Sequence, residues 1–157
     1  MKKLFLLRHG RSEAKRDGLA DASRCLTAEG RTEIAAMAER LDPSLEFDAV
    51  IASPAVRAQE TWDTFRRGLG LAASARTDGR LYPATALRSL VELVEALEDE
   101  ARSVLLIGHN PQFEDFGRQF DPDLELVAGG LVRIDLDVES WRDVAKSQGT
   151  LTRLSPE

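Results

Sequence analysis

The sequence is short of the residues from which disulfide frameworks and zinc sites are built. It contains one cysteine, Cys25, and two histidines, His9 and His109, in 157 residues. A single cysteine excludes a disulfide within the chain, and so few ligands of this kind argue against a zinc site. We therefore expect an activity that requires neither a metal ion nor another cofactor.

Long hydrophobic runs and an excess of positive charge are also absent. No apolar stretch approaches the roughly 20 residues needed to span a bilayer. After the basic residues 1–3, the apolar run covers only residues 4–7, whereas a signal peptide needs about 7–15 apolar residues. The net charge of −6 argues against general nucleic-acid binding, although it leaves room for a local basic pocket. These features predict a cytoplasmic protein whose partners include neither nucleic acid nor membrane. We also expect a monomer.

The hydrophobic pattern predicts one domain, residues 1–157, in which strands alternate with helices. Expected strands are 3–7, 49–52, 75–78, 103–107, 132–138 and 149–154, and expected helices are 27–41, 55–68, 84–99 and 111–119. The stretch 11–25 is polar and is expected to be a long loop. The strict alternation after Gly129-Gly130 favours an antiparallel strand at a sheet edge. The order predicts an α/β fold: a three-layer α/β/α sandwich with a mostly parallel central sheet and one antiparallel edge strand.

Three of the expected strands are followed by polar residues. Arg8-His9-Gly10 follows the first strand, Ser53-Pro54 and then Arg57 follow the second, and Gly108-His109 follows a later one. The carboxyl ends of parallel strands meet at one edge, where ligands bind in such folds. Arginine suits phosphate oxygens, and the start of the helix after Pro54 offers free N–H groups. None of these motifs contains a carboxylate. They predict a phosphate pocket with a histidine nucleophile.

Each motif alone has an ordinary structural explanation. A histidine at a strand end is usually structural or solvated, and Arg57 alone would be a surface residue of a helix. Ser53-Pro54 is a common turn, and Gly108-His109 alone is a strand-to-helix connection. The functional interpretation rests on the joint occurrence of the motifs at strand ends that should be neighbours.

The ordered set of motifs resembles the histidine phosphatase superfamily, also called phosphoglycerate mutase-like. The matching segments are Arg8-His9-Gly10, Ser53-Pro54-x-x-Arg57-Ala58-x-x-Thr61, Gly108-His109-Asn110-Pro111 and the late Gly129-Gly130. The short chain, together with Asp21 to Gly30, is most similar to the SixA-like phosphohistidine phosphatase branch. That branch commonly carries Asp-x-x-Arg-x-Leu-Thr-x-x-Gly at this place.

The resemblance implies a mechanism. His9 would attack phosphorus and carry a covalent phosphoryl group, which water then removes. Nearby cations would help to keep His9 unprotonated. The groups implied to hold the phosphoryl oxygens are Arg8, Arg57 and His109, with Arg24 and Ser12 as additional contacts.

The general acid of the wider family is not recognisable. Many members have a carboxylate between the second arginine motif and the second histidine, but residues 78–85 contain none near Tyr82-Pro83, and only Asp78 could substitute. Alkoxide leaving groups need protonation, whereas phosphoramidates need it less. We therefore expect a metal-independent phosphatase for phosphohistidine, or another labile phosphoryl group, on a protein. The alternatives are a phosphomonoesterase for a small metabolite and a non-catalytic phosphate- or phosphoprotein-binding module.

Overall fold

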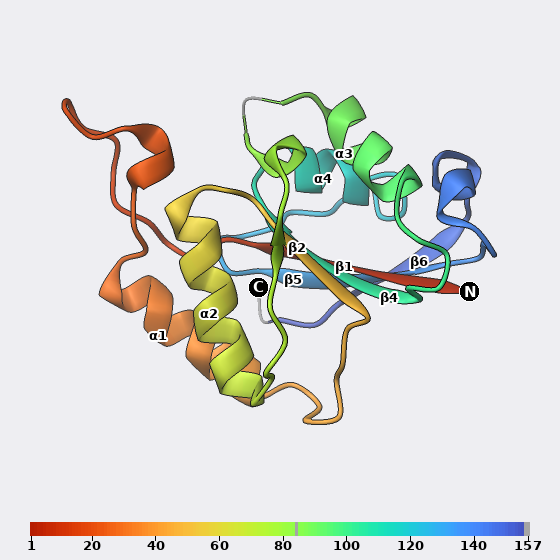
Figure 1. Ribbon diagram of the computed structural model, residues 1–157, viewed down its shortest axis with the longest axis horizontal. Helices are drawn as coiled ribbons and strands as arrows, with labels where there is room; N and C mark the ends of the chain where they lie inside the picture. The colour runs from red at the N-terminus through yellow and green to blue at the C-terminus, as the bar shows by residue number, and fades with distance from the viewer. Residues whose placement is uncertain (84, 156–157) are drawn as a thin grey trace.

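A six-stranded sheet forms the centre of the computed structural model, which describes residues 1–83 and 85–155 (Figure 1). The strands are β1 (Lys2–Arg8), β2 (Ala49–Ala52), β3 (Arg76–Thr77), β4 (Ser103–Gly108), β5 (Leu131–Leu136) and β6 (Gly149–Arg153). Their order across the sheet is β3-β2-β4-β1-β5-β6. The first four strands are parallel, while β5 is antiparallel to both of its neighbours.

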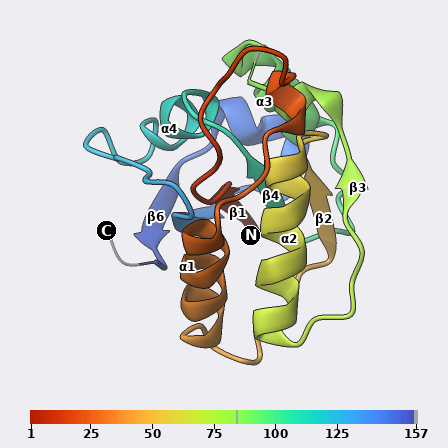
Figure 2. The same cartoon turned by 90° about the vertical axis from the view of Figure 1, so that its left-hand side faces the viewer.

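Helices cover both faces of this sheet. They are α1 (Ala28–Glu39), α2 (Val56–Leu69), α3 (Leu87–Glu95) and α4 (Gln112–Gly117), with the short 3₁₀ helices η1 (Asp21–Ser23), η2 (Gly79–Leu81) and η3 (Trp141–Lys146). Figure 2 shows α1 and α2 side by side below the sheet, with α3 and α4 above it. None of the described helices is long and apolar enough to cross a membrane.

Strand β1 shows why the fold has three layers. Leu4 and Leu6 belong to the hydrophobic cluster that packs against α3 and α4. Phe5 and Leu7, which alternate with them, belong to the cluster on the α1 and α2 side. A central parallel strand is buried on both faces, so its sequence is a continuous apolar run. The predicted three-layer α/β/α sandwich with a mostly parallel sheet is confirmed.

The predicted edge position of the antiparallel strand is wrong. Strand β5 is antiparallel, but it lies between β1 and β6, which pairs with it from Val132↔Arg153 to Leu136↔Gly149. The alternation of Ile134 with the half-buried Arg133 shows only that one face of β5 is partly solvated. An exposed face does not make a strand an edge strand, and β6 occupies that place.

The helix predicted over 84–99 is shorter in the structure. Its expected first residue, 84, lies outside the described residues, and Ala86 has extended backbone angles that place the start of α3 at Leu87. At the other end, the N–H of Leu97 donates to the carbonyl of Val94, a tighter turn than an α-helical one. Leu97 is buried nonetheless, so hydrophobic periodicity extends beyond the helix. The single domain over 1–157 stays a prediction, and residues 156–157 lie outside the described part.

Candidate active site

Strand pairing brings the two histidines together. Strands β1 and β4 are parallel neighbours with Arg8 opposite Gly108, so the next residue of each chain segment leaves the sheet at the same edge. The ring centroids of His9 and His109 lie 5.0 Å apart. The prediction that both histidines would contribute to one edge of the sheet therefore agrees with their positions.

A cavity of about 320 Å³ lies at this edge. It is lined by Arg8, His9, Ser12, Lys15, Asp21, Arg24, Arg57, Pro83, His109 and Asn110. The structure thus brings all six site residues named from the sequence to one cavity, and their chemical roles stay a proposal. A larger hollow of about 450 Å³ beside α1, lined by residues such as Arg11 and Val127, contains neither histidine.

The ring of His9 is held in one tautomer. Its Nδ1 lies 2.7 Å from the carbonyl oxygen of Gly10. A carbonyl only accepts, so Nδ1 carries the proton and Nε2 keeps a lone pair. The pKa of His9 is lowered to about 4, mainly by burial and also by the charges of Arg57 and Arg8, while the bond to Gly10 opposes the shift. Nearby cations were expected to keep His9 unprotonated, but burial is the larger cause.

His109 is more deeply enclosed, with 2% of its surface exposed. Its Nε2 lies 2.8 Å from Oγ of Ser53, the residue that follows β2. Burial lowers the pKa of His109 to about 3, and the neighbouring His9 and Arg57 act in the same direction. Both imidazoles are therefore neutral at physiological pH.

Hydrogen bonds to backbone carbonyls hold the guanidinium groups of two arginines. Arg8 donates from Nη1 to the carbonyl of Leu126 at 2.9 Å, and Arg57 donates from Nη1 to the carbonyl of Asp21 at 2.8 Å. Within the described part of the chain, the buried Nε atoms of both arginines have no hydrogen-bond partner. Buried donors without a partner are rare and require an explanation. An anion in the cavity would provide one.

Asp21 is a carboxylate of the cavity that was not predicted as a site residue from the sequence. Its Oδ1 lies 2.9 Å from Nη2 of Arg24, and its Oδ2 lies 3.2 Å from Nη2 of Arg57. The hydroxyl of Tyr82 donates to Oδ2 at 2.5 Å. The bond from Tyr82 and the ion pairs with the two arginines hold the pKa of Asp21 well below its usual range, although burial opposes this. At physiological pH Asp21 is therefore an anion paired with two arginines.

The Asp21 and Tyr82 contacts were detectable only in part from the sequence. Asp21 lies three residues before Arg24 and was noted there only as part of the family segment. Nothing local connects it with Arg57 or Tyr82, which come from α2 and the loop after η2. Arg24 is further fixed because its Nη1 donates to the carbonyl of Glu13 at 2.7 Å.

Ser12 and Gly10 occupy the loop after β1. Ser12 lines the cavity, and its Oγ lies 3.4 Å from Nη1 of Arg24, a long contact. Gly10 is closely packed, because a Cβ there would lie 3.1 Å from Cγ1 of Ile34 and 3.3 Å from Leu26. Packing against α1 and the loop before it leaves little room for a larger residue.

Asp78, the one substitute acid named from the sequence, is engaged elsewhere. Its carboxylate forms an ion pair with Arg80 at 2.8 Å and accepts from the backbone N–H of the same residue at the start of η2. The hydrogen bond from Arg80 lowers the pKa of Asp78. Among the described residues, Asp21 is the only carboxylate lining the cavity, and no group of three His, Cys, Asp or Glu side chains there could hold a metal ion.

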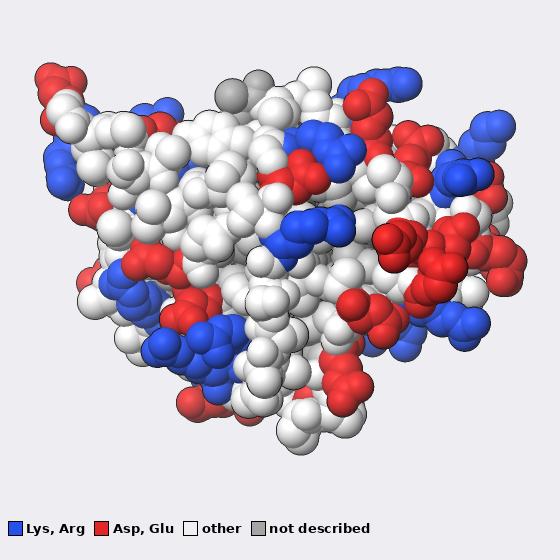
Figure 3. Space-filling model, viewed as in Figure 1, with Lys and Arg blue, Asp and Glu red and all other residues white. Residues whose placement is uncertain are grey.

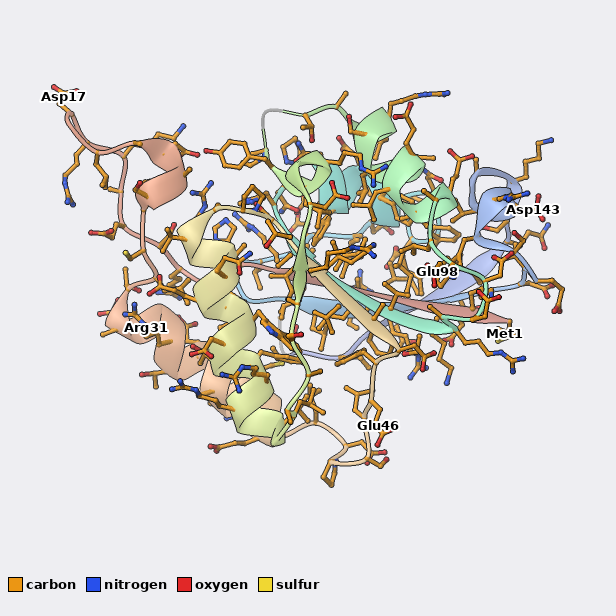
Figure 4. All side chains as sticks on the ribbon, in the orientation of Figure 1. Met1, Asp17, Arg31, Glu46, Glu98 and Asp143 are labelled. Carbon is orange, nitrogen blue, oxygen red and sulfur yellow. The ribbon has the colours of Figure 1, made fainter. Side chains whose placement is uncertain are left out.

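The negative charge of the chain is not gathered at the site. Figure 3 shows acidic side chains concentrated toward the end of the molecule where β1 begins, whereas the histidines follow its other end. The loop between β1 and η1 extends away from the sheet, with Asp17 at its tip (Figure 4). This loop carries Lys15, which lines the cavity from the solvent side.

Comparisons with known proteins agree with this geometry. A sequence model described as the histidine phosphatase superfamily (branch 1) matches residues 4–82. The chain is 34% identical over 110 residues to the phosphohistidine phosphatase SixA of Escherichia coli K12, covering 69% of this chain and 67% of that protein.

Solved structures extend the similarity to nearly the whole chain. A structure of the protein histidine phosphatase SixA complexed with tungstate superposes with a TM-score of 0.81 at 26% identity, covering 98% of this chain and 97% of that one. A mycobacterial glucosyl-3-phosphoglycerate phosphatase complexed with VO₃ shares the fold, with a TM-score of 0.70 at 18% identity over 96% of this chain and 97% of that one.

Proposed function

Because the chain belongs to the histidine phosphatase superfamily, we propose that it is a phosphohistidine phosphatase that works through a covalent intermediate on His9. The observation that carries this proposal is the neutral His9 ring. Its Nδ1–H is bound to Gly10, and its Nε2 lone pair is left for reaction at a cavity lined by cations. The named SixA relatives and the tungstate-bound SixA structure support the substrate class.

The first step transfers the phosphoryl group to the protein. Nε2 of His9 forms a bond to phosphorus while the bond from phosphorus to the leaving nitrogen breaks and its electron pair goes to that nitrogen. Arg8 and Arg57 hold the equatorial oxygens, using Nε donors that have no partner among the described residues. Such fixed donors stabilise the charge of the transition state. In the second step a water oxygen attacks phosphorus, the Nε2–P bond breaks with its electron pair returning to Nε2, and the proton lost by the water passes to solvent as phosphate leaves.

The kind of leaving group that suits the site can be inferred from the carboxylates near the cavity. Asp21 is held as an anion by Arg24, Arg57 and Tyr82, and Asp78 is paired with Arg80. A site whose described carboxylates are all held in this way is poorly suited to an alkoxide leaving group. It suits the imidazole of phosphohistidine, which leaves as a neutral ring when its other nitrogen is protonated. Arg24 and Ser12 also line the cavity and are proposed as additional substrate contacts.

The test compares a phosphohistidine-bearing protein, an aryl phosphate and an alkyl phosphate as substrates, with wild type and His9→Ala in the presence of EDTA. We expect turnover of phosphohistidine well above that of the alkyl ester, lost in the variant and unaffected by EDTA. Preference for the alkyl ester would point to a metabolite phosphomonoesterase. Phosphate binding without turnover of any substrate would point to a binding module.

Three further features stay predictions of this proposal. The residues of the cavity are expected to act without a metal ion, the protein to function as a monomer, and its location to be the cytoplasm. Gel filtration at micromolar concentration tests the oligomeric state, and activity after exhaustive chelation tests the need for metal.

A further inference from the structure

Ser53 contacts the second histidine at the edge of the sheet. Strands β2 and β4 are parallel neighbours with Ala52 opposite Ile107, and the N–H of Ser53 continues the pairing by donating to the carbonyl of Ile107 at 2.9 Å. The side chain of Ser53 is fully buried. Its Oγ lies 2.8 Å from Nε2 of His109 and accepts from the N–H of Ala55 at 3.2 Å.

The hydrogen-bonding capacity of Ser53 decides whether its hydroxyl or Nε2 of His109 is the donor in the bond between them. A hydroxyl has one hydrogen and two lone pairs, and the N–H of Ala55 uses one lone pair. Within the described part of the chain, Nε2 of His109 is the acceptor that the structure offers to the hydroxyl hydrogen. The reverse arrangement, with Nε2–H donating to Ser53, would leave a buried hydroxyl hydrogen without an acceptor, which is costly.

The proton of His109 must then be on Nδ1. That atom is buried and has no hydrogen-bond partner among residues 1–83 and 85–155. His109 lines the cavity together with His9, Arg8 and Arg57. A phosphoryl oxygen there can accept a hydrogen bond from Nδ1–H. In the other tautomer, the lone pair of Nδ1 would face the oxygen and repel it. The pKa of His109, lowered by burial to about 3, keeps the ring neutral, so the choice of tautomer has a consequence.

We propose that Ser53 is a positioning residue that fixes the tautomer of His109, so that its Nδ1–H donates to an oxygen of the phosphoryl group. The inference rests on the proposed phosphatase function and deepens it. A neutral imidazole has one donor, and a group that directs this donor determines whether the ring attracts or repels the transferring phosphoryl group.

The test measures the tautomer directly by ¹⁵N NMR of the imidazole rings at pH 7, in the free protein and with vanadate bound. Only two histidines are present, so His9→Ala assigns the spectrum. We expect a protonated Nδ1 and an unprotonated Nε2 at His109 in wild type. In Ser53→Ala the preference for that tautomer should weaken, and kcat for an aryl phosphate should fall by about 10- to 100-fold, as for other partners that orient a ring.

Two further variants separate positioning from folding. Ser53→Thr keeps a hydroxyl and should restore both the tautomer and most of kcat. Ser44→Ala removes a hydroxyl bound to Asp42 in an exposed turn and should change neither. A protonated Nε2 in wild type would overturn the proposal even if Ser53→Ala failed to fold. An unchanged tautomer and kcat in folded Ser53→Ala would overturn it as well. If wild type did not hydrolyse phosphohistidine, the proposed function would fail, while the spectra with vanadate would still decide the role of Ser53.

Discussion

The two histidines of the cavity lie 5.0 Å apart, yet the chain surrounds them differently. A backbone carbonyl, which can only accept, holds Nδ1 of His9. A hydroxyl, which can donate, contacts Nε2 of His109. One ring therefore keeps a lone pair for reaction, and the other, by the assignment made above, keeps an N–H. In this proposal one histidine is the nucleophile and the other a hydrogen-bond donor. The difference arises because one ring nitrogen contacts a group that accepts a hydrogen bond, and the other contacts a group that donates one.

The largest loss of kcat that would distinguish the two histidines is expected from substitution of His9. His9→Ala removes the only lone pair assigned to attack and should lower kcat by at least about 10⁴-fold, with no trapped phosphoenzyme. His109→Ala should lower kcat by about 10²- to 10³-fold, with a phosphoenzyme that still forms slowly. Rapid quench with radioactive phosphohistidine and base-stable, acid-labile labelling measures both. His9 is only half-buried at the end of β1, so thermal melting should show a folded variant. Retention of turnover in His9→Ala would contradict the mechanism.

A smaller loss is expected when the geometry of Arg57 changes without loss of charge. Arg57→Lys keeps the cation but removes the fork that contacts Asp21 and is proposed to hold phosphoryl oxygens. Vanadate affinity and kcat/KM should each fall by about 10- to 100-fold, measured by inhibition and by initial rates. Arg66→Lys, in the last turn of the same helix and paired with Asp63, is the matched control and should behave as wild type. Equal losses in both variants would remove Arg57 from the phosphate site.

The pKa values of the two rings provide a third test. Because burial lowers both pKa values, to about 4 and about 3, neither ring should titrate near pH 6.5. ¹³C NMR of the ring carbons should stay constant from pH 8 down to about 5. An inflection near 6.5 in the folded protein would contradict the burial of that ring.

The same pKa shifts predict how the free energy of unfolding changes with pH. Unfolded histidine binds a proton below about pH 6.5, while the folded rings do not until about 4 and 3. The unfolded state therefore holds more protons in this range, and the free energy of unfolding should decrease as pH falls from about 6.5 toward 4. Urea unfolding at pH 7 and pH 5 measures this, and His9→Ala should reduce the difference.

The residues at the ends of β1 and β4 could be predicted because of how central strands are built. An apolar run buried on both faces ends where polar residues begin, so the sequence alone predicts Arg8, His9 and His109 at one edge of the sheet. The position of β5 could not be predicted in the same way, because the alternation of Arg133 with buried residues describes a face and not a neighbour.

The Asp21 network could not be predicted for another reason. Asp21 lies in η1, at the end of a polar loop without periodicity, and its contacts with Arg57 and Tyr82 join segments far apart in sequence. The bond between Ser53 and His109 is similar, because strand order places the residues at one edge but only side-chain geometry shows the contact. Local patterns therefore located the cations and imidazoles, and long-range contacts decide their protonation and orientation.

The smallest effect on kcat is expected at Asp78, the carboxylate considered as a substitute general acid beside the two histidines. Asp78→Asn should leave kcat for aryl and alkyl phosphates within about twofold of wild type and the ratio of the two unchanged, because a carboxylate held by Arg80 and absent from the cavity lining cannot deliver a proton. The variant loses the charge that pairs with Arg80 and caps η2, so its cost should lie in stability, at about 0.5–2 kcal/mol. A selective loss of alkyl phosphate turnover would mean that the loop carrying Asp78 reaches the substrate, and that His9 and His109 share the site with an acid after all.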